Sequence, residues 1–444
     1  MNRRDALKLA GISVATTAVS AKETAKKSDL SNVRVMSAAA NLPKNGKGAK
    51  IVIVGGGWSG LSVAKRLKQY IPDADVVLVE QNTTFISCPI SNLWLVGGVE
   101  LEFITHSFLD AANNNGYTYF NASVFDIDRK KRKVYTNEGY LDYEYLVLAP
   151  GIDYDYSAWT NGDTALEYEL STKYPAGFKN HSEHDTIRRK IENFKEGNFL
   201  LTVPGGNYRC LPAPYERACL IADYMKKNKI KGKVVLMDEN PDVTIKAEGF
   251  HAAFNEMYKD YLVYMPNAKI EEIDLKNKKV MTEFDEVSFS DAAFYPRVRG
   301  SKLLEIAGVA KDAINKGEAN IDPFTYQVIG DPHVYCSGDS RPMAFSKSGN
   351  TSNSEGYIVA RSIRDKILGQ KNVWKSPHTE CFSAVALNPM RAMSVNTDYQ
   401  WSESNKSFTF FNVAMMQNWH DKSGTDAGKG LIEWGDAMYK DMFY

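Results

Sequence analysis

The feature that most constrains the fold is a glycine cluster between an apolar strand and an amphipathic helix, in "KIVIVGGGWSGLSVAKRLKQY". Residues 51–54 predict a buried strand, and after the turn Leu61, Ala64 and Leu67 recur at helical spacing. A second apolar strand is predicted at 76–79. Strand, glycine turn, helix and strand in this order are typical of the first unit of a Rossmann-like parallel sheet. The chain is therefore expected to belong to the α/β class.

The glycines of this turn are spaced as in a dinucleotide-binding fingerprint. Gly55, Gly57 and Gly60 form G-x-G-x-x-G, and Glu80 follows at the end of the second predicted strand. The first glycine permits the tight turn, the second lets the backbone approach a pyrophosphate, and the third allows close packing of the helix. Glu80 is placed to accept hydrogen bonds from ribose hydroxyls. The pattern favours a bound dinucleotide over a merely structural glycine turn.

Three further patterns favour FAD over NAD as that dinucleotide. The motif begins the fold, "YLVLAPG" ends at Gly151 like the strand-then-glycine exit of flavoproteins with two dinucleotide domains, and "CSGD" supplies Gly338 and Asp339. The Asp339 carboxylate suits the ribityl chain. The second α/β unit, "GNFLLTVPGGNYRCLPAP", has Pro212 and Pro214 where a third glycine would open the helix. We therefore expect no pyrophosphate cradle there, and an electron source other than NAD(P)H.

Composition and charge indicate an ordinary globular protein of several domains. Hydrophobic residues make up 43% and charged residues 24% of 444 residues, and the 54 basic side chains equal the 54 acidic ones, so no net field favours nucleic acid or an anionic membrane. A shift to aromatic and Met-rich sequence near residue 376 indicates a separate C-terminal region. The expected divisions are a signal peptide at 1–21, a linker at 22–48, the first part of an FAD-binding domain at 49–160, a second Rossmann-like domain without an NAD fingerprint at 161–310, the returning part of the FAD-binding domain at 311–375, and a C-terminal α+β domain at 376–444.

The N-terminal residues have the pattern of an export signal. Arg3 and Arg4 precede a weakly apolar run that ends in small residues at Ala21, which is typical of a twin-arginine signal. A disordered basic terminus is the alternative. The run is too short to span a bilayer. Export by this route implies a periplasmic protein that folds before export. A location outside the cytoplasm permits disulfides.

The cysteines match no metal or haem motif. There are five of them: Cys88, Cys210, Cys219, Cys336 and Cys381. None lies in C-x-x-C or C-x-x-C-H, and the spacings fit no zinc pattern, so no metal site and no haem are expected in this chain. Cys219 and Cys336 lie in apolar segments and are expected to pack in the core. Cys210 follows Arg209, a neighbour that favours thiolate, although a structural disulfide is an open alternative.

Several segments in order along the chain resemble one family. "ISCPISNLWLVGG", "YRCLPAPYERA", "GDSRPMAFSKSGNTSNSEG", "TECFSAV" and "WGDAMYKDMF" together resemble the flavoprotein subunit of flavocytochrome c sulfide dehydrogenase. The resemblance implies two dinucleotide-type domains related to the disulfide reductases, in the manner of glutathione reductase. It also implies bound FAD, oxidation of sulfide in the periplasm, and transfer of electrons to a separate c-type cytochrome subunit.

The resemblance assigns roles to individual residues. Cys88 matches the cysteine that bonds covalently to the flavin 8α carbon, and Cys210 and Cys381 match the pair that forms a redox-active disulfide. Glu216 matches the proposed general base. Two more residues match positions near the flavin: Lys347 at the ring and Asp339 at the ribityl chain.

Two other functions are compatible with these residues. A sulfide:quinone oxidoreductase shares the fold and the cysteine chemistry, but it needs a surface that faces a membrane. The C-terminal "GLIEWGDAMYKDMFY" could lie in an interface, yet Asp436, Asp441 and the low basic charge favour a docked core helix, and no stable membrane insertion is expected. The other function is that of a non-catalytic flavin-binding scaffold for a cytochrome.

Overall fold

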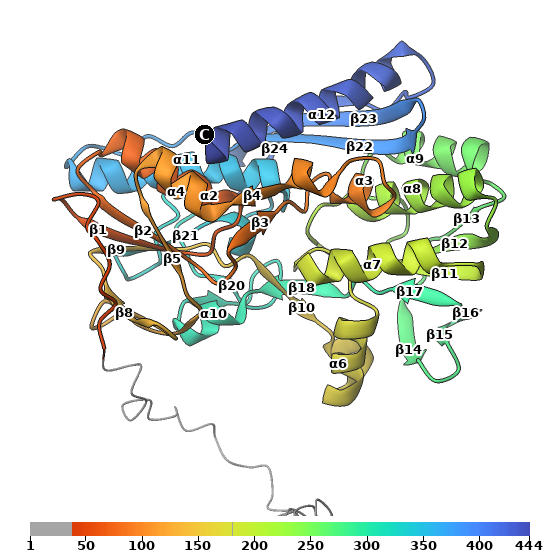
Figure 1. Ribbon diagram of the computed structural model, residues 1–444, viewed down its shortest axis with the longest axis horizontal. Helices are drawn as coiled ribbons and strands as arrows, with labels where there is room; N and C mark the ends of the chain where they lie inside the picture. The colour runs from red at the N-terminus through yellow and green to blue at the C-terminus, as the bar shows by residue number, and fades with distance from the viewer. Residues whose placement is uncertain (1–37, 180) are drawn as a thin grey trace, which may run out of the picture.

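The computed structural model describes residues 38–179 and 181–444. The predicted signal peptide and most of the predicted linker lie outside the described residues. Two α/β units lie side by side, and the C-terminal helix runs along the top of both (Figure 1). The predicted α/β class with two Rossmann-like units is confirmed.

The first unit is built on a five-stranded parallel sheet in the order β21-β9-β1-β2-β5. Its strands are β21 (Val334–Cys336), β9 (Tyr145–Leu148), β1 (Lys50–Val54), β2 (Asp75–Glu80) and β5 (Thr118–Asn121). Helices α2 (Trp58–Tyr70), α4 (Phe108–Asn115) and α11 (Gly349–Ile367) lie along one face (Figure 1). The predicted apolar stripe Leu61, Ala64 and Leu67 is fully buried, so the strand-turn-helix-strand pattern is confirmed.

A small antiparallel sheet lies on the other side of this unit (Figure 1). It contains β6 (Val124–Asp128), β7 (Lys133–Thr136) and β8 (Gly139–Asp142). The chain then enters β9 and leaves the first unit after Gly151.

The predicted linker ends earlier than residue 48. The amide of Ala40 donates to the Tyr140 carbonyl at 3.0 Å. The Asn45 side chain donates to the Val76 carbonyl at 2.7 Å and accepts from the Val76 amide at 2.9 Å. Residues 38–48 are therefore part of the folded unit, because Asn45 satisfies backbone groups at the start of β2 that would otherwise lack partners.

The second unit has a parallel sheet in the order β13-β12-β11-β17. Its strands are β13 (Leu262–Met265), β12 (Lys231–Asp238), β11 (Glu196–Val203) and β17 (Asp291–Ala293). Helix α8 (Ala213–Asn228) packs on this sheet, and α7 (His181–Asn193) packs against α3 (Ser91–Leu95) of the first unit. Pro212 and Pro214 stand at the start of α8, where the sequence predicted that no glycine turn would form.

Two antiparallel strands, β10 (Ile152–Asp155) and β18 (Arg297–Gly300), connect the units. The remaining elements are β3 (Thr84–Ile86), η3 (Leu101–Ile104), β4 (Thr105–Ser107), α5 (Ser157–Thr160), α6 (Thr164–Lys173), α9 (Ala247–Ala252), η4 (Ala253–Met257), β14 (Ile270–Asp274), β15 (Lys279–Thr282), β16 (Glu286–Ser288), α10 (Lys302–Ile306), β19 (Ala310–Lys311), β20 (Glu318–Ala319) and η5 (Gly338–Ser340).

The C-terminal region has a sheet of its own, and it packs on both other units. Strands β22 (Thr379–Leu387), β23 (Met390–Ser402) and β24 (Ser407–Met416) form an antiparallel sheet, followed by α12 (Lys422–Phe443). Strand β22 packs on α8 of the second unit and on α11 of the first. The region therefore contacts both units, and α12 runs above them in the view of Figure 1.

Helix α12 is docked on the first unit, as its acidic residues predicted. Trp434 stacks on Trp58 at the N-terminus of α2, with ring centroids 6.0 Å apart. Asp441 forms an ion pair with Arg66, and the Asn114 side chain donates to the Phe443 carbonyl at 2.9 Å. In the part of the chain that the structure describes, no helix combines the length and apolarity needed to cross a bilayer.

Candidate active site

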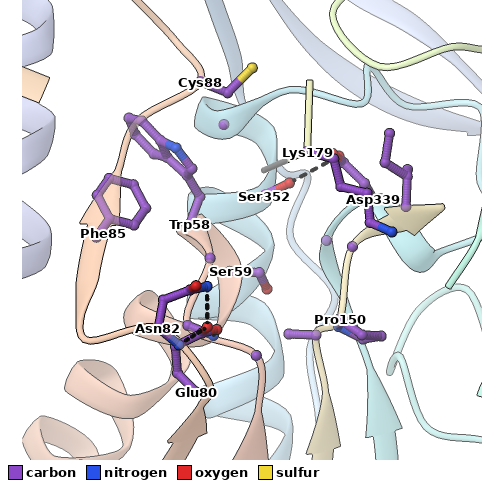
Figure 2. Close-up of a pocket in the computed structure, with 18 of the residues that line it drawn as sticks. Trp58, Ser59, Glu80, Asn82, Phe85, Cys88, Pro150, Lys179, Asp339 and Ser352 are labelled. Atoms are coloured by element: carbon purple, nitrogen blue, oxygen red, sulfur yellow. Dashed lines mark hydrogen bonds between the residues drawn. The ribbon is translucent and has the colours of Figure 1, made fainter. Parts of the chain in front are cut away.

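A long cavity begins at the glycine turn and follows the carboxyl ends of the first sheet. Seven of the nine predicted cofactor-binding residues line it: Gly55, Gly57, Glu80, Cys88, Gly151, Gly338 and Asp339. Figure 2 shows Glu80 at one end of this cavity, Cys88 at the other, and Asp339 at the side between them. This order matches an extended dinucleotide, with a ribose near Glu80 and the second ring system near Cys88.

The backbone of the turn leaves room for a pyrophosphate. Gly55 has φ +104°, and a Cβ there would meet the Ala149 carbonyl oxygen at 2.3 Å. A Cβ on Gly60, the predicted glycine that does not line the cavity, would lie 1.9 Å from the Gly55 carbonyl oxygen, so this glycine allows α2 to approach the turn. A Cβ on Gly57 would meet nothing within 4 Å, and no described side chain caps the helix there. The first amides of α2 therefore remain available to an anion.

The Glu80 carboxylate lies at the edge of the turn. One oxygen accepts a hydrogen bond from the Gly56 amide at 2.8 Å, and the other accepts from the Asn82 amide at 2.9 Å. These contacts hold the carboxylate at the end of β2 and orient it toward the cavity (Figure 2). The contact of Glu80 with a ribose remains a prediction.

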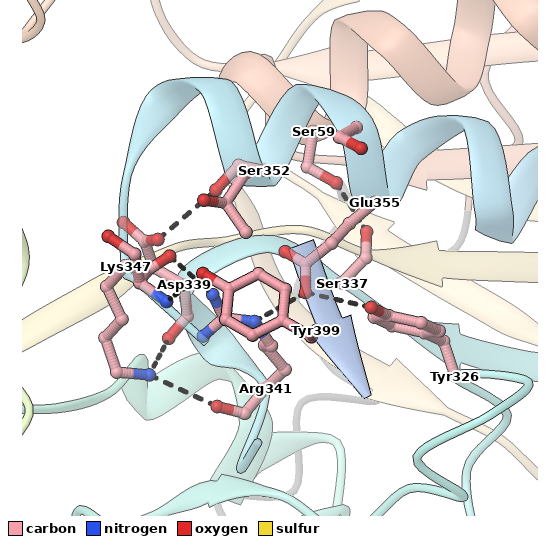
Figure 3. Close-up of polar contacts among 12 residues, drawn as sticks. Ser59, Tyr326, Ser337, Asp339, Arg341, Lys347, Ser352, Glu355 and Tyr399 are labelled. Carbon is pink, nitrogen blue, oxygen red and sulfur yellow. Dashed lines mark hydrogen bonds and ion pairs between the residues drawn. The ribbon is translucent and has the colours of Figure 1, made fainter. Parts of the chain in front are cut away.

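Asp339 is held in place by neighbours on both sides. Its carboxylate forms an ion pair with Arg209 at 3.2 Å and accepts a hydrogen bond from the Ser352 hydroxyl at 3.2 Å. Ser352 comes from α11 and lies beside Asp339 (Figure 3). Arg209 comes from the loop before α8, so the two units meet at this carboxylate.

Lys347 does not line the cavity, although the resemblance placed it near the flavin ring. Its ammonium forms an ion pair with Glu318 at 2.8 Å and donates to the backbone carbonyls of Asp339 and Arg341 at 2.7 and 3.2 Å (Figure 3). The physical reason is burial, since Lys347 is only 1% exposed and a buried ammonium needs a close carboxylate and further acceptors. Lys347 therefore shapes the loop that carries Asp339.

A second buried ion pair supports the same loop. The Arg341 guanidinium contacts the Glu355 carboxylate at 2.5 Å, and the Tyr326 hydroxyl donates to the same oxygen at 3.0 Å (Figure 3). Burial raises the pKa of Glu355 to about 7, and the Arg341 cation opposes this rise. Both side chains of the ion pair are completely buried, and the Arg341 guanidinium also donates to the Ser346 carbonyl at 2.7 Å in the same loop.

A second cavity contains the predicted catalytic residues and adjoins the first. Cys210, Cys381 and Glu216 line it, and Cys88 and Arg209 line both cavities. All five cysteines are free thiols in this structure, and the thiols of Cys210 and Cys381 hydrogen-bond to each other. The structure therefore shows this pair as a dithiol, and the redox-active disulfide remains a prediction. Cys219 and Cys336 are buried in the core, as predicted.

The pair comes from two segments far apart in the chain. Cys210 lies in the loop that replaces the glycine turn of the second unit, in a left-handed conformation with φ +58°. Its amide donates to the Lys347 carbonyl at 2.7 Å, which ties this loop to the first unit. Cys381 lies on β22 of the C-terminal sheet. The left-handed conformation costs a non-glycine residue about 1–3 kcal/mol, and such strain is common at functional sites.

The two thiols of the pair differ in their acidity. The hydrogen bond that the Cys210 thiol donates to the Cys381 sulfur raises the pKa of Cys210 and lowers the pKa of Cys381. Burial raises the pKa of the Cys88 thiol, while the Arg209 cation acts in the opposite direction.

Glu216 lies in the first turn of α8, beside the pair. Its carboxylate accepts hydrogen bonds from the Ala384 amide and from the Asn92 side chain, each at 2.7 Å. Burial raises its pKa to about 7, and these two hydrogen bonds oppose the rise. A carboxylate of this acidity can accept and release a proton near neutral pH.

Sequence reasoning did not identify several residues around this pair. Asn92 links Glu216 to Arg217, whose guanidinium donates to the Asn92 side-chain oxygen at 2.9 Å. Lys246 donates to the Cys381 carbonyl at 3.1 Å and to the Ser383 hydroxyl at 3.0 Å. Asn92, Arg217 and Ser383 lie inside the quoted segments that carry the resemblance, although no role was assigned to them there, whereas Lys246 lies in no quoted segment.

Comparisons with known protein families agree with this geometry. Residues 49–185 match the family model described as pyridine nucleotide-disulphide oxidoreductase. Residues 185–293 match the model described as the central part of the sulfide dehydrogenase [flavocytochrome c] flavoprotein chain. Together the two models span residues 49–293, which include most strands of the first unit and the sheet of the second.

The chain is a pyridine nucleotide-disulphide oxidoreductase of the flavocytochrome c sulfide dehydrogenase-like group. The oxidoreductase is similar to mitochondrial sulfide:quinone oxidoreductase of Mus musculus, with 24% identity over 79% of this chain and 78% of that protein. It is also similar to type II NADH:quinone oxidoreductase of Staphylococcus haemolyticus, with 23% identity over 72% of this chain and 83% of that protein.

A solved structure has the same fold as this oxidoreductase. The sulfide:quinone oxidoreductase of Aquifex aeolicus superposes with a TM-score of 0.69 at 16% identity, over 89% of this chain and 92% of that one. The oxidoreductase is a flavoprotein, and FAD is its cofactor. The cavity fits FAD because its glycine turn, open helix N-terminus and Asp339 follow one another along its length.

Proposed function

We propose that this oxidoreductase is a periplasmic FAD-dependent sulfide dehydrogenase that passes electrons to a c-type cytochrome subunit. The observation that carries the proposal is the thiol pair Cys210 and Cys381, beside Glu216 in a cavity that shares Cys88 with the FAD cavity. The match of the central residues to the sulfide dehydrogenase flavoprotein chain supports sulfide as the donor. The Arg3 and Arg4 pattern supports export to the periplasm.

The cysteine pair would perform the sulfur chemistry. Hydrosulfide attacks one sulfur of a Cys210–Cys381 disulfide, a new S–S bond forms, the old one breaks, and the other cysteine leaves as a thiolate. Transfer of the outer persulfide sulfur to a second hydrosulfide releases a two-sulfur anion and leaves the reduced pair. The two cysteines then hold the two electrons that were taken from sulfide. FAD, when bound, supplies a two-electron acceptor that can return electrons singly.

Glu216 would handle the proton of the incoming sulfide. It lies in the same cavity as both thiols, and its carboxylate is held by the Ala384 amide and the Asn92 side chain. When ionised it can accept a proton from hydrogen sulfide, which delivers hydrosulfide at the disulfide.

Cys88 is proposed to bind FAD covalently. Cys88 lies at the end of the cavity opposite Glu80 (Figure 2). FAD whose ribose lies at Glu80 would therefore place its ring system at Cys88. We expect FAD to remain on the chain after acid or urea denaturation, and mass spectrometry of the denatured protein to show the added mass of FAD. Cys88→Ser is expected to bind FAD that separates completely on denaturation. Complete separation from the unaltered protein would rule out the bond.

Sulfide:quinone oxidoreductase is the second candidate, because relatives with that name match most of the chain. The electron acceptor distinguishes the two functions. Sulfide is expected to bleach the flavin absorbance under anaerobic conditions, and oxidised c-type cytochrome is expected to restore it faster than a soluble quinone does. Restoration by quinone alone would favour the second candidate. Absence of bleaching by sulfide would contradict both enzymatic functions and would favour a non-catalytic flavin-binding scaffold for a cytochrome.

The proposed cytochrome subunit can be sought in the native organism. We expect a haem protein to co-purify with the oxidoreductase from a periplasmic extract, and its absorbance to be reduced when sulfide is added to the purified complex. The same fraction prepared with the Cys381→Ser variant is expected to contain the haem protein but to leave it oxidised.

A further inference from the structure

Lys246 is a buried cation whose position the proposed chemistry does not yet use. It stands in the loop between β12 and α9, it is only 1% exposed, and its backbone adopts the left-handed conformation with φ +57°. Among the described residues no carboxylate lies within ion-pair distance of its ammonium, whereas the equally buried Lys347 pairs with Glu318 at 2.8 Å. An unpaired buried ammonium is costly, which points to another anionic partner.

The ammonium of Lys246 instead faces the strand segment that carries Cys381. It donates to the Cys381 carbonyl at 3.1 Å and to the Ser383 hydroxyl oxygen at 3.0 Å. Cys381 and Ser383 are two residues apart on β22, so their side chains project to the same face of the strand. The Ser383 hydroxyl lowers the pKa of the neighbouring Cys381 thiol.

These contacts define the direction of each hydrogen bond. An ammonium can only donate, so the Ser383 oxygen accepts from Lys246. The Ser383 hydroxyl hydrogen is then free to point toward the Cys381 sulfur on the same face of β22. A sulfur that accepts from Ser383 and from the Cys210 thiol is favoured as a thiolate. Two donors therefore converge on Cys381, and one of them is polarised by a cation.

Other charged groups lie near this sulfur. Glu380 precedes Cys381 on β22 and raises its pKa, while Lys246 lowers it. Glu216 from α8 acts on Lys246 and on Cys381. Arg209 and Arg217 also line the cavity, but Arg209 is bound to Asp339, and Arg217 to Asn92 and backbone carbonyls. The residues that α11 and α12 contribute to the cavity, Asn350, Leu431 and Trp434 among them, are uncharged.

We propose that Lys246, acting through Ser383, is a positioning residue that fixes the negative charge of the reduced cysteine pair on the Cys381 sulfur. This inference deepens the proposed function, on which it rests, because the reduced pair forms each time sulfide opens the disulfide. When Cys381 carries the negative charge, Cys210 is the protonated cysteine of the pair. The Cys210 thiol then donates a hydrogen bond to the Cys381 sulfur. Cys210 also lies close enough to Cys88 for the two sulfurs to interact electrostatically.

The test measures where the charge lies and does not require turnover. The FAD-loaded full chain is reduced anaerobically and treated with iodoacetamide over a range of pH, and mass spectrometry follows alkylation of the Cys381 and Cys210 peptides separately. In the unaltered protein Cys381 is expected to be alkylated at lower pH than Cys210, because thiolate is the reactive form. In Lys246→Met the midpoint for Cys381 is expected to rise by about one pH unit or more, the usual effect of removing a close opposite charge.

A second pair of variants separates the relay from loss of packing. Ser383→Ala removes the bridging hydroxyl and is expected to raise the Cys381 midpoint, whereas Ser383→Thr keeps the hydroxyl and should leave the midpoint unchanged. If Lys246→Met does not retain FAD, the Ser383 variants decide the question. Unchanged midpoints in Lys246→Met and Ser383→Ala would overturn the inference. Because sulfide is absent from this experiment, failure of the proposed sulfide chemistry would appear only in the flavin bleaching assay.

Discussion

Replacing Cys381 by Ser is expected to abolish sulfide-dependent bleaching of the flavin while FAD stays bound. The substitution leaves Cys210 without the partner with which it would form the disulfide, so hydrosulfide has no S–S bond to attack. Loss of a covalent catalytic group typically lowers a rate by about a thousandfold or more. Stopped-flow absorbance of the flavin after mixing with sulfide measures the effect directly.

The control for this result is a cysteine that lines neither cavity. Cys219 is fully buried in α8, and Cys219→Ala is expected to retain sulfide oxidation. Both variants should show the flavin spectrum of the unaltered protein, because Cys381 is absent from the FAD cavity. Sulfide oxidation at the ordinary rate in Cys381→Ser would exclude the disulfide mechanism and would require direct reaction of sulfide with the cofactor.

Replacing Glu216 by Gln is expected to lower the rate of sulfide oxidation by about a hundredfold and to flatten its dependence on pH. Burial raises the pKa of Glu216 to about 7, so the carboxyl is mostly protonated below that pH and can act as a base only above it. The rate of the unaltered protein should therefore rise through about pH 7. Gln preserves the size of the side chain but has no group to titrate.

Hydrogen sulfide also ionises in water, and the same substitution separates this effect from that of the enzyme. Both proteins meet the same substrate at each pH, so the ratio of their rates reports the ionisation of Glu216. We expect this ratio to increase with pH and to level off above about 7. A ratio that is constant across the range would show that Glu216 is not the base.

The same pKa predicts the sign of a stability effect that serves as a folding control. The folded protein holds a proton on Glu216 up to about pH 7, whereas an unfolded chain releases it near the ordinary value of 4.5. The unaltered protein therefore loses stability as pH rises through this window. Glu216→Gln lacks this loss, so its melting temperature relative to the unaltered protein should increase between acidic and neutral pH.

The nucleotide-binding unit could be predicted from the sequence because its geometry is dictated locally. A left-handed turn at Gly55 and the close approach of α2 at Gly60 demand residues without a Cβ, and these demands leave a visible pattern within six residues. The same logic applies to the second unit, where Pro212 and Pro214 indicated that α8 would begin without a glycine turn. Here the residues that make the structure are neighbours in the chain.

Lys347 has a partner that its local sequence does not indicate. Its ammonium forms an ion pair with Glu318 in β20, and its proximity to the flavin remains a prediction. The C-terminal region is a sheet and a helix, as predicted, but its packing on both other units is not visible in its composition. In each case the energetics of burial, summed over distant residues, decided the outcome.

The sequence by itself determined the dinucleotide unit, the absence of an NAD fingerprint in the second unit, and which cysteines stand in unusual local settings. Only the tertiary structure brought Cys210 and Cys381 into contact and surrounded them with Glu216, Lys246 and Ser383. The reason is physical. A turn is specified by the allowed backbone angles of a few adjacent residues, whereas a reactive thiol is specified by the charges and donors around it. Those groups come from α8, the loop before α9, and β22, which meet only when the three parts of the molecule pack together.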